Sequence, residues 1–131
     1  LDIAQQVMHD VPVNIETGYV NVIWQGDAIQ QIIQSATHAG TPPQILNITG
    51  SETLSVREIA LEFGRRLGRS PRFSGTESAT CWLSNNQKAC KLFGPPSTSV
   101  EQMLDWVSAW LNAGGQTLNK PTHFQIRDGN Y

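Results

Sequence analysis

Two cysteines and three histidines are the side chains of this sequence that most readily bind metals or act as nucleophiles and bases. Cys81 and Cys90 stand nine positions apart without a nearby histidine. That is not a metal-binding spacing, and a disulfide framework normally has more pairs. His9, His38 and His123 are far apart and lie outside any cluster of carboxylates or cysteines. We therefore predict no metal site, no histidine base and no disulfide, with both thiols buried or incidental.

Two further polar residues match chemical patterns but have structural explanations. Asp27 precedes a helical pattern and Gln30 follows three positions later, so we interpret Asp27 as a helix N-cap rather than a site acid. Asn47, Ile48 and Thr49 fit the pattern of a glycosylation acceptor. They lie in a predicted buried strand, so we interpret this match as accidental.

Composition excludes several classes of function. The chain has 131 residues, enough for one domain with a core, and it is 39% hydrophobic and 15% charged. A net charge of -2 provides no electrostatic surface for nucleic acid or anionic membranes. The sequence contains no apolar run of 18 residues and does not open with a signal peptide. We expect a cytoplasmic protein, and we expect this chain to be a piece of a longer one.

Hydrophobic periodicity and breaker residues predict the elements that position these side chains. Helices are expected over 1–9, from Asp27 to about 36, from the Ser55 cap to Gly68, over 85–93 and from the Ser99 cap to 111. Strands are expected over 20–24, 45–49, 71–74 and 81–83. The predicted buried stripe of the second helix comprises Ala28, Ile29, Ile32, Ile33 and Ala36. The alternation of strands and helices predicts an α/β fold, a short sheet with about four helices.

Four segments, taken in order, resemble the end of a known family. Residues 18–28 contain Gly-Tyr-Val-Asn-Val-Ile-Trp followed by Asp-Ala, and residues 45–58 contain Asn-Ile-Thr-Gly and then Ser-Val-Arg-Glu. Residues 84–95 contain Asn-Asn-Gln-Lys-Ala and Leu-Phe-Gly-Pro, and a closing helix begins at Ser99. Together they resemble the NAD-dependent epimerases/dehydratases, the extended short-chain dehydrogenase/reductase family. The resemblance implies that residues 1–112 form the carboxy-terminal, substrate-binding region of a Rossmann-type enzyme, with 113–131 an irregular tail.

The family's catalytic equipment has no counterpart in this sequence. Its members hold NAD or NADP with a Gly-rich loop after a strand and transfer protons with a Tyr and a Lys one helical turn apart. Here Gly64 and Gly68 lie at the end of a predicted helix, and Tyr19 is followed four positions later by Ile23. The resemblance thus implies that cofactor and chemistry belong to a missing amino-terminal Rossmann part. We expect this chain alone to bind no cofactor and to be catalytically silent.

The resemblance also points to substrate contacts. It places the loop 72–82 at the cleft of the enzyme, where Glu77 and Trp82 are candidate contacts for a small-molecule substrate, with Asn85 just beyond. A packed aromatic and a helix cap are the structural alternatives for Trp82 and Asn85. Nucleotide-sugar members have arginines near positions where this sequence has Val20 and the segment 75–78. These departures argue against a UDP-sugar pocket and leave epimerase, dehydratase and reductase open.

Two other functions compete with the enzyme hypothesis. The chain could be a freestanding binding or interaction module, or part of an NAD(P)-sensing relative that lost its activity. Independently of these, the predicted apolar strand 45–49 would lack neighbours without the missing part. Because an open apolar edge invites pairing with another chain, we expect self-association of the isolated chain.

Overall fold

A computed structural model describes residues 1–77, 81–118, 120 and 122. The chain divides into two compact units, which are presented separately. Unit 1 comprises residues 1–20, 54–82 and 104–131, and unit 2 comprises residues 21–53 and 83–103. Among the described residues, no helix is both long enough and apolar enough to cross a membrane. Part of the expected irregular tail, residues 119, 121 and 123–131 with His123 among them, lies outside the described residues.

Unit 1 contains two small sheets. Strand β1 (Val13–Asn14) pairs in parallel with β4 (Phe73–Ser74). Strand β2 (Tyr19–Val20) lies between β3 (Leu54–Ser55), which is antiparallel to it, and β5 (Cys81–Trp82), which is parallel. The predicted strands at 71–74 and 81–83 are confirmed with shorter bounds. The breaker residues around 10–14 hid β1, which the sequence did not predict.

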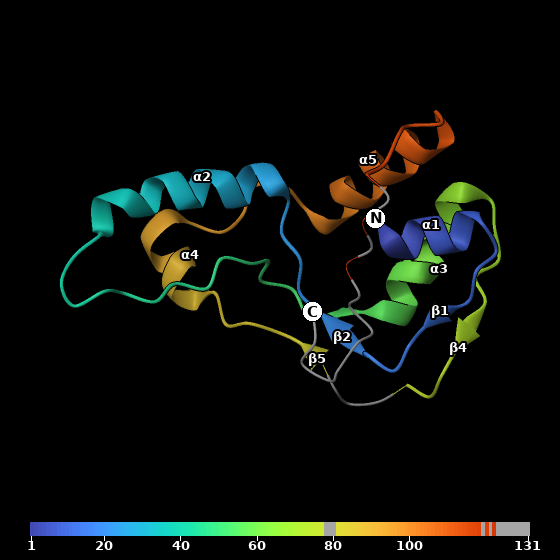
Figure 1. The fold of residues 1–131 in the computed structure, drawn as a ribbon, viewed down its shortest axis with the longest axis horizontal. Helices are drawn as coiled ribbons and strands as arrows, with labels where there is room; N and C mark the ends of the chain where they lie inside the picture. The colour runs from blue at the N-terminus through green and yellow to red at the C-terminus, as the bar shows by residue number, and fades with distance from the viewer. Residues whose placement is uncertain (78–80, 119, 121, 123–131) are drawn as a thin grey trace. The chain divides into compact units, whose positions relative to one another are not determined.

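Helices α1 (Asp2–Met8) and α3 (Val56–Leu67) pack against one another in unit 1 (Figure 1). The hydroxyl of Ser55 accepts the N–H of Glu58, and Gly68 ends α3 with a φ of 65°. Both caps confirm the predicted start and end of this helix. The core of unit 1 consists of Ala4, Val7, Val13, Ile15, Val56, Ala60, Phe63, Leu104 and Leu111.

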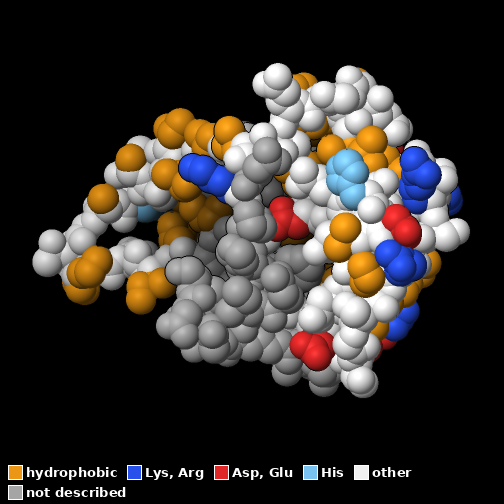
Figure 2. All heavy atoms as spheres, turned by 45° about the vertical axis from the view of Figure 1, so that its right-hand side comes forward, with side chains coloured by type: hydrophobic (Ala, Val, Ile, Leu, Met, Phe, Trp, Pro, Cys, Tyr) orange, Lys and Arg blue, Asp and Glu red, His pale blue; other side chains and the backbone are white. Residues whose placement is uncertain are grey.

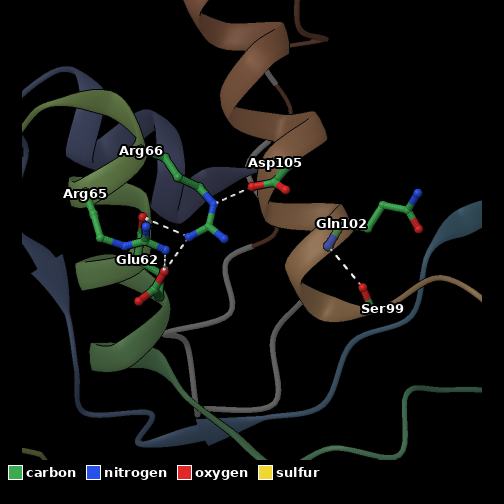
Figure 3. A network of polar contacts seen from close by, with 6 residues as sticks. All are labelled: Glu62, Arg65, Arg66, Ser99, Gln102 and Asp105. Atoms are coloured by element: carbon green, nitrogen blue, oxygen red, sulfur yellow. Dashed lines mark hydrogen bonds and ion pairs between the residues drawn. The ribbon is translucent and has the colours of Figure 1, made fainter.

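A buried arginine connects α3 to the last helix, α5 (Val100–Asn112). The side chain of Arg66 is only 8% exposed, and its Nε donates to Asp105 of α5 at 2.8 Å (Figure 3). Arg66 and Arg65 also pair with Glu62, and these hydrogen bonds hold the pKa of the Glu62 carboxyl below its ordinary value. A guanidinium has several N–H donors in a fixed geometry, so it can bind two carboxylates at once.

Unit 2 is built from helices and extended segments without a strand. Helix α2 (Gln25–Ser35) continues into a 3₁₀ turn, η1 (Ala36–His38), and contacts α4 (Gln87–Phe93). The hydroxyl of Ser99 accepts the N–H of Gln102, which confirms the predicted cap of α5 (Figure 3). The α/β class is confirmed, with five α-helices in the described part of the chain.

Two strand predictions are wrong in whole or in part. The strand expected over 20–24 ends at Val20, and the segment expected as a buried strand over 45–49 is irregular. Ile45 is 84% exposed and Asn47 is exposed as well, so burial no longer argues against the glycosylation pattern. The Thr49 carbonyl accepts from the side chain of Asn86, 37 positions away, rather than from a neighbouring strand. The open sheet edge proposed for self-association is therefore absent.

The predicted roles on α2 are also corrected. Trp24 occupies the N-cap position, and Asp27 lies in the first turn, only 6% exposed. Its carboxylate accepts from the Ser97 hydroxyl at 2.6 Å and from the Thr98 N–H at 3.0 Å. The helix buries Asp27 and Gln31, whereas the isoleucines of the predicted apolar stripe are exposed. The bonds to the 97–98 turn thus decide which face of α2 is turned inward.

Asp27 should contribute to stability in a pH-dependent way. The Ser97 hydroxyl, with smaller contributions from Thr98, holds the Asp27 pKa below its ordinary value although burial opposes this. Because the pKa of Asp27 is lower in the folded than in the unfolded state, the ionised carboxylate stabilises the folded protein at pH values above the unfolded-state pKa of about 4. This stabilisation is lost as the pH falls through the folded-state pKa. We expect D27N to lower the free energy of unfolding by about 2 kcal/mol at pH 7, measured by urea denaturation.

The matched control is E52Q, which removes a charge from an exposed position of the same unit. The difference between wild type and D27N should shrink in acid, where the wild-type carboxylate is protonated. An equal loss of stability in D27N and E52Q at pH 7, or a D27N effect independent of pH, would contradict this role.

Candidate functional site

Asn21 joins two distant segments of unit 2. Its Nδ2 donates to the carbonyl oxygens of Gly50, at 3.1 Å, and of Ser84, at 2.8 Å. Its Oδ1 accepts the N–H of Ser84 at 3.3 Å. One amide therefore makes bonds of the kind that a neighbouring strand would supply. It holds the turn at 49–51 beside the residues that precede α4.

Two other asparagines reinforce this junction. Asn86, only 8% exposed, donates through Nδ2 to the Thr49 carbonyl at 2.7 Å and to the Ser51 hydroxyl at 3.0 Å. Asn47 donates through Nδ2 to the Asn85 carbonyl at 3.0 Å. Because a buried amide without partners is costly, these bonds favour a single arrangement of the two segments.

An open cavity of about 380 Å³ lies at this junction within unit 2. Its lining is almost entirely uncharged and polar: Asn21, Ser51, Thr53, Leu83, Ser84, Asn85, Asn86 and Gln87. The amides and hydroxyls of these residues offer both donors and acceptors. Such a lining is suited to hydrogen bonding with neutral polar groups.

The described lining of the cavity offers neutral groups. Among the residues that the structure describes, none of those that line it is Asp, Glu, His, Lys or Arg. No group of three or more His, Cys, Asp or Glu side chains that could hold a metal ion occurs in the part of the chain that is described. The nearest thiol, Cys90, has its Sγ 3.6 Å from the Ser51 hydroxyl. Cys81 and Cys90 are free thiols. The lining can bind and orient a group but lacks a residue that would move a proton.

The three predicted site residues lie in different places. Asn85 lines the cavity, and its Oδ1 accepts the N–H of Gln87 at 2.9 Å. Glu77 and Trp82 belong to unit 1 and are not among the lining residues. Glu77 pairs with Arg57 at 3.0 Å, and Trp82, 41% exposed, lies in β5. As substrate contacts, all three remain predictions.

Asn85 combines a structural bond with a free donor. The predicted structural alternative, Asn85 as the helix cap, is wrong, because Asn86 occupies the N-cap position of α4; the bond from the Gln87 N–H still lets Asn85 order the start of this helix. Its Nδ2 has no hydrogen-bond partner among the described residues, and the side chain is exposed at the cavity. This amide N–H is thus available to a ligand.

Sequence reasoning missed Asn21 and Asn86 as determinants of this cavity. Both were visible only as polar residues in or near predicted elements. The run from Ser84 to Gln87 contains four neutral polar side chains, which was the available signal. Their partners lie 29 to 63 positions away along the chain, so the junction could not be derived from local patterns.

The fold matches parts of solved enzyme structures. UDP-glucuronic acid 4-epimerase from Bacillus cereus, in complex with NAD, matches 87% of this chain at a TM-score of 0.65 and 19% identity. UDP-glucose 4-epimerase from Thermus thermophilus matches 85% at 0.67 and 13% identity. The dTDP-glucose 4,6-dehydratase from Bacillus anthracis matches 85% at 0.65 and 15% identity. No family model and no curated protein matches the sequence.

These matches confirm the fold implied by the resemblance to NAD-dependent epimerases/dehydratases. At such low identity they establish the fold alone. The chain spans about 39% of the length of the first two enzymes and 37% of the third. More than half of each matched enzyme therefore lies outside the shared part.

Gly50 provides a test of the junction. A Cβ added there would lie 1.9 Å from the carbonyl oxygen of Val22, within unit 2. We expect G50A to force the backbone apart and lower the free energy of unfolding by about 3 kcal/mol, measured by chemical denaturation. The control is G40A, because a Cβ at Gly40 meets nothing within 4 Å. Equal denaturation midpoints for the two variants would show that the turn at Gly50 is not held as described.

Proposed function

We propose that this chain is the substrate-binding part of an NAD(P)-dependent enzyme of the epimerase, dehydratase or reductase type. The observation that carries the proposal is the fold match, which covers most of this chain but only about two fifths of each matched enzyme. The matched enzymes include two UDP-sugar epimerases and a dTDP-glucose dehydratase whose structures contain NAD. Under this proposal the nicotinamide cofactor and the proton-transferring residues belong to a polypeptide part outside these 131 residues.

The neutral cavity of unit 2 supports a role in binding rather than catalysis. Its amides and hydroxyls can hydrogen-bond a hydroxyl-rich or carbonyl-bearing small molecule without placing a charge beside it. Asn85 is the proposed contact in this cavity, and Glu77 and Trp82 are proposed contacts on unit 1. Taken without the rest of the enzyme, the chain is proposed to bind no cofactor, to be inactive and to self-associate through exposed apolar side chains.

Cofactor titration separates this proposal from its alternatives. The polypeptide encoded by the complete reading frame, called the complete polypeptide below, should bind NADH or NADPH and convert a nucleotide sugar or a carbonyl substrate. Nicotinamide fluorescence and turnover assays with UDP-glucose, UDP-glucuronic acid and dTDP-glucose provide the measurements. The 131-residue chain should give no signal in either assay.

The other outcomes assign other functions. Cofactor binding without turnover of any substrate would favour the NAD(P)-sensing relative. If the complete polypeptide bound neither dinucleotide, the enzyme hypothesis would fail and the binding module would take its place. Binding of NADH by the 131-residue chain itself would contradict the assignment of the cofactor to another part.

Two substitutions at Asn85 separate contact with a ligand from the ordering of the start of α4. An aspartate keeps an acceptor for the Gln87 N–H but removes the free amide donor, whereas an alanine removes both. We expect N85A and N85D each to lower kcat/KM of the complete polypeptide about tenfold, the effect of losing one hydrogen bond. Only N85A should lower the free energy of unfolding, by about 1 kcal/mol.

The control is Q34A, which shortens an exposed amide on α2 away from the cavity. It should leave kcat/KM and stability unchanged. Full activity of N85D would show that Asn85 only orders the start of α4, and Asn85 would then be removed from the proposed substrate contacts.

A further inference from the structure

Helix α2 turns its apolar side outward. Ile29, Ile32 and Ile33 are 47%, 56% and 68% exposed, whereas Asp27 and Gln31 are 6% and 5% exposed. The three isoleucines recur at the spacing of one helix face, and the two polar residues lie four apart on the opposite side. A helix that exposes isoleucine and buries carboxylate and amide is the reverse of the usual arrangement in water. The set Ile29, Ile32 and Ile33 is called the α2 face below.

The sequence that contains the α2 face lacks charge over a long stretch. Residues 28–51 contain no Asp, Glu, Lys or Arg. The charge just before them, on Asp27, is buried and hydrogen-bonded within unit 2. Solvated surfaces normally carry charged residues at about 25–35% of positions, and the centres of interfaces are depleted of them. A segment that is fully exposed to solvent would not be expected to contain so long an uncharged stretch.

Further apolar side chains of unit 2 are exposed, within this stretch and outside it. They are Val22, Trp24, Ile45, Leu83 and Leu92. Figure 2 shows hydrophobic side chains gathered on the surface of the part that carries α2. Large exposed apolar patches mark interaction sites in proteins. A lipid surface is a poor fit, because helices that lie on membranes carry Lys and Arg on their polar side and α2 has neither.

We propose that the α2 face is the docking surface for the polypeptide part that completes this chain, an α/β body like the unmatched part of the matched enzymes. This inference rests on the proposed function. The matched enzymes extend well beyond the shared fold, since this chain spans about 39% of their length. Such a body belongs to the same polypeptide, so it supplies an apolar partner surface at a high local concentration. A face of three isoleucines needs this proximity more than a charged face does, because it has no charge that attracts a partner. Burying the three side chains removes the main apolar exposure of α2.

Site-specific thiol labelling of the complete polypeptide tests the docking. I33C places a thiol on the α2 face, and Q34C places one at the adjacent exposed position of the same helix. Both are made with C81S and C90S to remove the native thiols. We expect the I33C thiol to react with a maleimide at least about tenfold more slowly than the Q34C thiol in the folded protein. The two rates should be equal in denaturing urea.

I32C gives a second reading if I33C fails to fold, and NADH binding is measured on each labelled sample. Equal rates at positions 33 and 34 in a protein that binds NADH would overturn the docking surface and leave the proposed function intact. Slow labelling at 33 in a protein that binds neither NADH nor NADPH would leave the docking surface and overturn the proposed function. Protection that rises with protein concentration would identify a second copy as the occupant and overturn the proposal.

Discussion

The arrangement of unit 2 depends on hydrogen bonds from asparagine side chains to backbone carbonyls. Asn21 and Asn86 bind the turn at 49–51 and thereby replace the strand pairing that this unit lacks. A strand ladder would tolerate many residue types, because only backbone atoms take part. Side-chain bonds require an amide at those positions, with little space near Gly50. The neutral cavity follows from this requirement, because the residues that hold the junction also line it.

A second constraint is the buried Asp27. Its two bonds to the turn at 97–98 direct one side of α2 inward, and the isoleucines are consequently turned outward. A buried carboxylate is tolerated only with such partners. The exposed apolar face is thus coupled to a polar contact inside the unit. This coupling agrees with the proposed docking, in which the polar side of α2 is hydrogen-bonded inside the unit and the apolar side is covered by a partner.

The fold and the site lead to the same view of function. The described residues offer hydrogen-bonding groups in an open cavity but no cluster that could bind a metal ion. The matched enzymes contain NAD and are more than twice as long as the shared part. The proposed function, with binding groups here and chemistry in another part, is based on both observations. The sequence has no arginine at Val20 or in the segment 75–78, where nucleotide-sugar members are expected to have one. The proposal therefore includes epimerase, dehydratase and reductase activities.

Local chemistry in the sequence determined the caps of α3 and α5, the positions of the five described α-helices within a few residues, and the α/β class. Those features depend on residues three or four positions apart, so they can be recognised from the sequence alone. The tertiary structure alone decided that 45–49 is no strand, that Asp27 is buried rather than a cap, and that the α2 isoleucines are exposed. Each of these outcomes depends on partners that lie 28 to 71 positions away. Periodicity predicts that a helix has an apolar face, but only the partners in space decide whether that face is covered.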